Sequence, residues 1–310
     1  MKVLITGASG FVGKALVQYL IARDHQVVCA GRRTVSMHAR AHFVPIANID
    51  AHTDWQSALQ DVEVVVHLAG RAHIQRESTH DPLRAFREVN VDGTLNLAQQ
   101  AAMTGVQRFI FVSSIGVLGG QSSRPFTEVD TPAPIEPYAI SKWEAEQRLT
   151  YLLKPSCTNF VIIRPPMVYG PGAPGNFNRL VSAIKKGVIL PLGAIENRRT
   201  LVALDNLIDF ISCCILHPAA ANQVFLTGDA QDLSTTELIC SLGAVLDRPA
   251  RLLPVPMWLL EGLAFLVGRR AMLQKICGNL QIDISKARKL LGWVPPLSVD
   301  EGLRKVVAIL

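Results

Sequence analysis

The sequence has little that would support a metal site, a disulfide framework or a membrane span. Its six cysteines and eight histidines show no metal-ligand spacing, and only Cys213 and Cys214 are adjacent. We therefore expect no metal ion and reduced, buried thiols. The most membrane-like stretch, residues 257–267, is far shorter than the roughly 20 residues of a span, and Glu261 interrupts it. We predict that it forms a helix of the core, with weak contact to a membrane surface as the alternative.

A large excess of charge is also missing. Lysine and arginine total 31 against 25 acidic residues, and the basic residues are scattered along the chain. Nucleic-acid binding usually needs a denser basic stripe, so we expect no nucleic-acid partner, whereas an anionic small molecule would suit this surface. Met1 and Lys2 lead straight into a short apolar run that lacks the length of a signal-peptide core. We expect a cytoplasmic, soluble protein with no transmembrane segment.

Apolar residues are plentiful at 49% of the 310 residues, which excludes intrinsic disorder. Short apolar runs alternate with longer amphipathic stretches through the first 165 residues. The predicted strands are Lys2–Thr6, Gln26–Ala30, His42–Ile46, Glu63–Leu68, Arg108–Ser113 and Asn159–Arg164. The predicted helices include Phe11–Ala22, Pro82–Met103 and Ala139–Leu153. This alternation predicts an α/β fold with a doubly wound parallel sheet.

A glycine-rich loop joins the first predicted strand to the first helix. It reads Gly7-Ala8-Ser9-Gly10-Phe11-Val12-Gly13. In this position the first glycine permits a tight turn, the second lets the backbone approach a pyrophosphate, and the third allows close packing of helix on strand. The helix N-terminus then faces the anion. The loop predicts a Rossmann-type dinucleotide-binding domain, with a purely structural turn as the alternative.

The end of the second strand bears on the choice of dinucleotide. It reads Gly31-Arg32-Arg33 and offers no carboxylate for the ribose hydroxyls of NAD. Two guanidinium groups suit a 2′-phosphate through bidentate, charge-assisted hydrogen bonds. We therefore predict NADP(H), with NAD(H) possible and a pair of solvated arginines as the alternative interpretation.

A tyrosine and a lysine stand one helical turn apart at the start of a predicted helix. Tyr138 and Lys142 share one helix face. The ammonium and a bound nicotinamide ring would both favour the phenolate, lowering the phenol pKa from near 10 by roughly three. Ser113 and Ser114 stand at the carboxyl end of a predicted strand and could hydrogen-bond the reacting oxygen. Since these groups follow the glycine loop in the order that such a site requires, we predict a catalytic set rather than a surface pair.

The amino-acid composition of the chain changes after Arg164. Residues 165–175 are dense in proline and glycine and predict a long loop, followed mainly by helices. The strands predicted there include Gln223–Thr227 and Arg251–Pro254. We predict a dinucleotide-binding domain over residues 1–165 and a smaller, mainly helical substrate lobe over residues 166–310, with some segments returning to the main sheet.

Together these residues resemble the extended short-chain dehydrogenase/reductase superfamily, in its nucleotide-sugar epimerase/dehydratase/reductase branch. Further matching segments are His67-Leu68-Ala69-Gly70, Val89–Thr94, Arg164–Gly172, Asp283–Ala287 and Leu291–Pro295. The resemblance implies that Ser114, Tyr138 and Lys142 are catalytic and that Asn90 has a hydrogen-bonding role. It also implies a homodimer.

The resemblance implies ligand contacts as well. The implied cofactor-binding residues are Gly7, Gly10, Phe11, Val12, Gly13, Arg32, Arg33, Asn48, Ile49, Leu68, Ala69, Gly70, Ser113, Tyr138, Lys142 and Pro165. Asn48 and Ile49 would lie at the adenine and Pro165 by the nicotinamide amide. Asn176 and Arg198 would hold the substrate diphosphate, while Ser114 and Tyr138 would contact the sugar.

The subclass follows from what stands beside Ser114. Sugar 4,6-dehydratases have an Asp-Glu pair there and fucose-type epimerase-reductases a cysteine, whereas this chain has Ile115. UDP-sugar 4-epimerases and 4-keto reductases remain. Arg32-Arg33 favour a reductase, segment 253–256 resembles reductases of surface-polysaccharide pathways, and segment 273–280 departs from common 4-epimerases. We therefore predict a 4-keto reductase of a UDP-(amino)deoxyhexose in surface-polysaccharide synthesis. The alternatives are a UDP-hexose 4-epimerase, acting on UDP-glucose or UDP-N-acetylglucosamine with tightly bound NAD, and a non-catalytic dinucleotide sensor.

Overall fold

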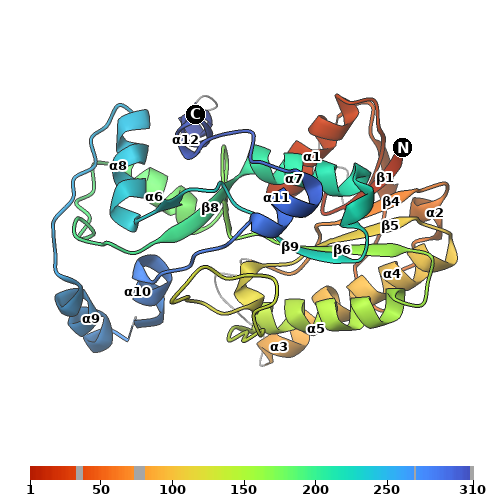
Figure 1. Cartoon of the computed structure of the whole chain (residues 1–310), viewed down its shortest axis with the longest axis horizontal. Helices are drawn as coiled ribbons and strands as arrows, with labels where there is room; N and C mark the ends of the chain where they lie inside the picture. Colours follow the sequence, from red (N-terminus) through yellow and green to blue (C-terminus); the bar gives the residue numbers. More distant parts are fainter. Residues whose placement is uncertain (33–37, 73–80, 269, 308–310) are drawn as a thin grey trace.

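A seven-stranded parallel sheet forms the centre of the computed structural model, which describes residues 1–310 except 33–37, 73–80, 269 and 308–310 (Figure 1). The strand order is β3-β2-β1-β4-β5-β6-β9, and every neighbouring pair is parallel. The strands are β1 (Lys2–Thr6), β2 (Gln26–Gly31), β3 (His42–Pro45), β4 (Val64–His67), β5 (Arg108–Val112), β6 (Asn159–Arg164) and β9 (Gln223–Leu226). The six strands predicted before residue 165 are present, each within one residue of its predicted ends.

Helices cover both faces of this sheet. One face carries α1 (Phe11–Ile21), α7 (Leu204–Leu216) and α11 (Ser285–Leu291), and the other α3 (Pro82–Arg87), α4 (Thr94–Met103) and α5 (Pro137–Leu153). Val3 and Ile5 of β1 pack with the first group, and Leu4 between them packs with the second. Both faces of the central strands are therefore buried, as apolar runs without alternation predict. The predicted doubly wound α/β fold is confirmed.

A smaller lobe is built on a second sheet of order β10-β8-β7. Its strands are β7 (Met167–Tyr169), β8 (Arg199–Ala203) and β10 (Asp232–Leu233). Its helices are α6 (Asn176–Lys185), α8 (Thr235–Val245), α9 (Met257–Leu266), α10 (Arg270–Cys277) and α12 (Val299–Val307). Short elements elsewhere are α2 (Gln56–Leu59), η1 (Glu88–Gly93), η2 (Ile115–Val117) and η3 (Pro218–Ala220). A domain boundary at residue 165 stays a prediction.

Three predictions about local structure were wrong. Residues 165–175 are not all loop, because β7 pairs with β8. Residues 251–254 form a single bridge, between Leu190 and Leu252, rather than a strand. The predicted helix 82–103 is interrupted by the π-helical turn η1, in which the side chain of Asn90 bonds outside its own helix. Each difference depends on a tertiary partner that the local pattern does not contain.

Two predictions about burial also fail. Cys157 and Cys240 are exposed, whereas Cys29, Cys214 and Cys277 are buried. The apolar helix α9 is not a core helix, because most of its large side chains are exposed and only Leu260 and Ala264 are buried. Among the described residues no helix has the length and apolar content needed to cross a membrane.

Candidate active site

The glycine loop between β1 and α1 is closely packed. Gly7 has a φ of +70°, and a Cβ placed on it would lie 2.7 Å from the backbone nitrogen of Ala69. A Cβ on Gly13 would lie 2.2 Å from the carbonyl oxygen of Gly7. No described side chain caps α1 at Gly10, so the first-turn N–H groups, which have no partner within a helix, are available to a ligand. These features fit a diphosphate held by backbone N–H groups.

The residues predicted to hold the adenosine lie at the ends of β2 and β3. Arg32 is exposed directly after β2, and Arg33 lies outside the described residues. Asn48 is exposed, and its carbonyl accepts a hydrogen bond from the Thr53 hydroxyl at 2.9 Å. Ile49 is half-buried and packs with the core layer that contains α4 and α5. Arg32, Asn48 and Ile49 follow the carboxyl ends of parallel strands, where such folds bind dinucleotides.

Lys142 lies at the centre of the site. Its ammonium is buried, donates a hydrogen bond to the Val112 carbonyl at 2.9 Å and lies 4.3 Å from the ring centroid of Phe111. A Cβ on Gly70 would lie 3.6 Å from Nζ, so the loop after β4 runs directly beside this amine. Burial lowers the pKa of Lys142 to about 8, and the negative charge of Glu146 opposes this shift.

Asn90 connects that loop to α5. Its Oδ1 accepts from the Arg71 backbone N–H at 2.8 Å, and its Nδ2 donates to Ser141 Oγ at 3.0 Å. Ser141 in turn donates to the Tyr138 carbonyl at 2.7 Å. The hydrogen-bonding role implied for Asn90 thus corresponds to a contact that orients the start of α5 against the loop.

The buried His67 takes part in a hydrogen-bond network that holds the loop after β4. Burial lowers the pKa of His67 to about 3, so the ring is neutral. Thr94 donates its hydroxyl proton to the Asn90 carbonyl, and so it accepts from Nε2–H of His67 at 3.0 Å. Nδ1 then accepts from Thr6 at 2.7 Å, and Thr6 also accepts from the Ala69 N–H. The network fixes the backbone that faces Gly7.

Tyr138 begins the first turn of α5, one turn before Lys142. Its ring packs edge-on against Phe86 of α3, with centroids 6.1 Å apart. Burial raises the pKa of Tyr138 to about 12. The lowering expected from Lys142 was therefore wrong for the protein alone, because burial disfavours the phenolate, while the lowering expected from a bound nicotinamide ring stays a prediction.

The two serines at the end of β5 have different surroundings. Ser113 is buried, and its Oγ has no hydrogen-bond partner among the described residues. Ser114 accepts from the Gly116 N–H at 3.1 Å, and Gly116 packs near Ala139, next to Tyr138. The following N–H, of Ile115, donates to the buried Pro165 carbonyl at 3.0 Å. The structure therefore brings Ser114 and Pro165 to the start of α5.

A buried ion pair that the sequence analysis missed lies behind this set. Glu146 and Arg164 are 2% and 4% exposed, and their side chains meet through contacts of 2.6 to 3.1 Å. Tyr138, Lys142 and Glu146 follow at intervals of four residues, so all three share one face of α5. That spacing was the available signal. The carboxylate keeps negative charge near Lys142.

We expect replacement of Arg164 by methionine to lower the free energy of unfolding by about 3–5 kcal/mol, because it leaves the Glu146 carboxylate buried without a partner. Urea denaturation followed by circular dichroism measures the change. The matched control is Arg84→Met in the exposed pair with Glu88, at 3.3 Å, which should leave the unfolding free energy nearly unchanged. Equal effects of the two substitutions would contradict the expectation.

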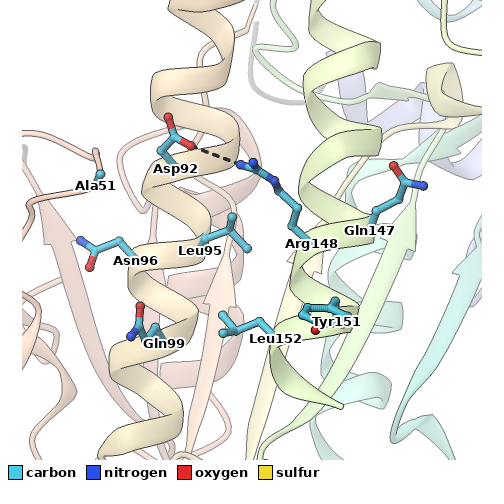
Figure 2. A pocket seen from close by; sticks show the side chains of 9 residues that line it. All are labelled: Ala51, Asp92, Leu95, Asn96, Gln99, Gln147, Arg148, Tyr151 and Leu152. Carbon is cyan, nitrogen blue, oxygen red and sulfur yellow. Dashed lines mark ion pairs between the residues drawn. The ribbon is translucent and has the colours of Figure 1, made fainter. Parts of the chain in front are cut away.

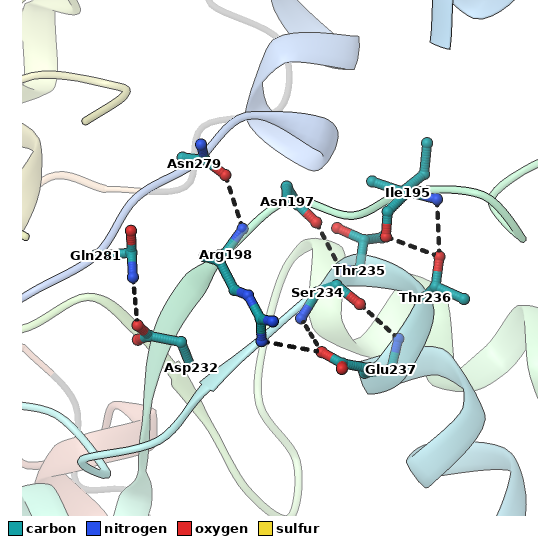
Figure 3. A network of polar contacts seen from close by, with 10 residues as sticks. All are labelled: Ile195, Asn197, Arg198, Asp232, Ser234, Thr235, Thr236, Glu237, Asn279 and Gln281. Carbon is teal, nitrogen blue, oxygen red and sulfur yellow. Dashed lines mark hydrogen bonds and ion pairs between the residues drawn. The ribbon is translucent and has the colours of Figure 1, made fainter. Parts of the chain in front are cut away.

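The residues predicted to hold the substrate diphosphate lie in the smaller lobe. Asn176 is exposed at the start of α6. The Arg198 side chain is exposed and lies 3.9 Å from the Glu237 carboxylate, while its backbone N–H donates to Asn279 at 2.7 Å (Figure 3). Because this exposed ion pair is weak, the Arg198 guanidinium is able to bind a diphosphate instead.

A surface groove between α4 and α5 is a separate feature (Figure 2). Its lining includes Asp92 and Arg148, whose side chains are 3.6 Å apart, and the exposed Tyr151. Tyr138, Lys142 and Gly70 do not line it. This groove is therefore not part of the predicted site.

The described residues fit a nicotinamide dinucleotide. The packed glycines and the uncapped N-terminus of α1 suit the diphosphate, and Gly70 and Lys142, both predicted to contact the cofactor, lie side by side. The orphan hydroxyl of Ser113 lies at the end of β5, near the Lys142 partner Val112. A buried polar atom without a protein partner is what a ligand contact explains.

Comparisons with known proteins identify the family to which this chain is similar. The sequence model of the NAD dependent epimerase/dehydratase family matches residues 3–228. The chain is 43% identical to a UDP-glucose 4-epimerase of Vibrio cholerae, over 98% of this chain and 94% of that protein. It is 29% identical to the N-acetyl-alpha-D-glucosaminyl-diphospho-ditrans,octacis-undecaprenol 4-epimerase of Escherichia coli O157:H7, over 99% and 94%. The crystal structure of a Bacillus cereus UDP-glucuronic acid 4-epimerase in complex with NAD has the same fold, with a TM-score of 0.80, 24% identity, and coverage of 100% of this chain and 96% of that one.

Proposed function

Because the chain belongs to the NAD dependent epimerase/dehydratase family and is an enzyme of this kind, we propose that it catalyses 4-epimerisation of a UDP-hexose. The observation that carries the proposal is the 43% identity to the Vibrio cholerae UDP-glucose 4-epimerase across nearly the whole of both chains. UDP-glucose is the first substrate to test, and UDP-N-acetylglucosamine is the second.

In the proposed reaction, proton transfer and substrate binding are assigned to different residues of the chain. Ser114 hydrogen-bonds the oxygen on C4 of the sugar, and Tyr138 takes the proton of that hydroxyl and later returns it. Lys142 holds positive charge beside the phenol and offers hydrogen bonds to a ribose. A nicotinamide dinucleotide, which the glycine loop and Lys142 would hold, would supply the acceptor and donor of the C4 hydride. Arg198 and Asn176 hold the diphosphate while the sugar turns.

The 4-keto reductase interpretation, which the sequence alone favours, has less support than the epimerase. The Vibrio cholerae and Escherichia coli relatives are both 4-epimerases. The arginines that favoured a reductase are Arg32, which is exposed, and Arg33, which lies outside the described residues. A reductase would use the same Ser114 and Tyr138, so it remains the second candidate.

A nicotinamide dinucleotide is the cofactor, and we propose tightly held NAD, since an epimerase reuses its cofactor in every turnover. The Bacillus cereus neighbour was crystallised with NAD. The NADP(H) prediction from Arg32 and Arg33 stays a prediction, as does the homodimer. Identification of the bound dinucleotide separates the two cofactors.

The purified protein tests the proposed function directly. We expect it to convert UDP-glucose to UDP-galactose without added cofactor, as followed by anion-exchange chromatography of the nucleotide sugars. Denaturation should release about one NAD per chain. A protein that releases no dinucleotide, but oxidises added NADPH in the presence of a 4-keto UDP-sugar, would be the reductase instead. Dinucleotide binding without any turnover would identify a sensor.

A further inference from the structure

The outer face of α9 is apolar and exposed. Trp258 is 71% exposed, Phe265 64% and Leu266 80%, and the remaining members of this α9 patch are Leu259, Leu263 and Val267. Figure 1 shows α9 at the edge of the smaller lobe, far from the large sheet. Single exposed apolar side chains are ordinary, but a contiguous group of this kind on a soluble protein marks an interaction surface.

The exposure is not the result of a detached helix. Leu260 and Ala264, one turn apart, are buried on the inner side of α9. Leu260 packs with Ile195 and Cys277 in a small cluster of its own. The helix is thus fixed to the lobe by one face and presents its other face outward.

Basic residues flank α9 in the sequence, and one of them, Arg270, lies against the patch. Residues 247–275 contain five basic side chains against Asp247 and Glu261; the basic ones are Arg248, Arg251, Arg269, Arg270 and Lys275. The Arg270 guanidinium lies 5.2 Å from the ring centroid of Phe265. Arg251 approaches Gly187, which follows the exposed Lys185 and Lys186. An apolar face beside the exposed Arg270, on a chain of net charge +6, is complementary to the surface of an anionic bilayer.

From this arrangement we propose that the α9 patch docks the protein on an anionic phospholipid bilayer. Trp258, Phe265 and Leu266 enter the boundary between headgroups and acyl chains, and Arg270 contacts lipid phosphates. A ten-residue helix is too short to span the hydrocarbon layer, so α9 lies in the plane of the interface. Two weak signals, apolar and electrostatic, act together and make the binding reversible.

The docking helix is linked to the active site through α10. Lys275 of α10 forms an ion pair of 2.5 Å with Glu136, two residues before Tyr138. Asn197, next to Arg198, donates to the carbonyls of Ile276 and Gly278 at the end of α10. A bilayer held at α9 therefore lies close to the elements that carry the predicted diphosphate site.

Vesicle flotation tests the docking surface. We expect the full chain to float with vesicles of phosphatidylcholine and phosphatidylglycerol and much less with phosphatidylcholine alone. The double variant Phe265→Ser/Leu266→Ser should bind the mixed vesicles about tenfold more weakly or worse. The matched control is Met103→Ser/Val129→Ser, two side chains that are 79% and 91% exposed elsewhere, and it should float as the parent does. Both variants should retain turnover of the parent's substrate in solution, which shows that they fold.

Tryptophan fluorescence reports the insertion itself. Trp55 and Trp293 are buried at 0% and 5% exposure and Trp143 is half-buried, so a blue shift on adding mixed vesicles would come from Trp258. Trp258→Phe should abolish the shift and keep flotation, and Arg270→Glu should weaken flotation. Equal binding to both kinds of vesicle, or to neither, would overturn the proposal. So would a change in mass by light scattering without lipid in Phe265→Ser/Leu266→Ser, because the patch would then join two copies of the chain.

Discussion

Tyr138→Phe is expected to lower the turnover number about a thousandfold while the bound dinucleotide is retained. The substitution removes the one hydroxyl proposed to carry the C4 proton, and general acid–base groups contribute about 10² to 10⁴ in rate. The ring itself would stay packed against Phe86, so the fold and the start of α5 are preserved. Conversion of UDP-glucose by the purified variant, normalised to the dinucleotide released on denaturation, measures the effect.

The matched control for that experiment lies on the same helix. Tyr151 is 86% exposed, three turns further along α5, and Tyr151→Phe should leave turnover unchanged. If Tyr138→Phe kept its turnover number within tenfold of the parent, Tyr138 would not be the proton carrier. A variant that lost both activity and dinucleotide would instead point to a role for the phenol in cofactor binding.

The parts of the fold that the sequence predicts well are those whose cause is local. The first six strands are short apolar runs bounded by turns, and each strand fits the sheet within one residue of its predicted ends. Gly7 and Gly13 have no space for a Cβ, so the glycine pattern reflects a steric requirement that any sequence in this loop must meet. A pattern fixed by backbone geometry survives tertiary context.

The parts that the sequence predicts poorly depend on a partner elsewhere in the chain. The composition of α9 shows that it could be buried, but its burial needs a surface to pack against, and the lobe covers only Leu260 and Ala264. Likewise, β7 forms because β8 lies beside it. The sequence places Glu146 four residues after Lys142 and so on the same helix face. Only the fold shows that Arg164 of β6 forms an ion pair with Glu146.

The pKa of Tyr138 illustrates the same limit in electrostatic terms. Spacing alone indicates that a cation is nearby and so predicts a lowered phenol pKa. The structure adds the desolvation of both groups, which moves the pKa of Tyr138 up to about 12 and that of Lys142 down to about 8. Burial disfavours both the phenolate and the ammonium. The size of this penalty is set by the surrounding packing rather than by the spacing of the two residues in the sequence.

These two pKa values make turnover depend on pH. The site must lose one proton before Tyr138 can accept the C4 proton, and Lys142, which has the lower pKa of the two groups, loses its proton first. Since Lys142 titrates at about 8, that first loss occurs at or below about pH 8. We therefore expect turnover to rise about tenfold per pH unit below this point and to level off above it. A stopped assay from pH 5.5 to 10 measures the profile.

Lys142→Met should remove that plateau. The first proton loss would then fall to Tyr138 alone, whose pKa is about 12, against about 8 for Lys142 in the parent. This pKa difference of about four lowers the fraction of enzyme that has lost the proton by about 10⁴ near pH 7. Turnover of the variant should therefore still be rising at pH 10. Lys154→Met, at the exposed end of the same helix, should keep the parent profile. A Lys142→Met enzyme with an unchanged apparent pKa, measured per bound dinucleotide, would show that the amine does not set the protonation state of the site.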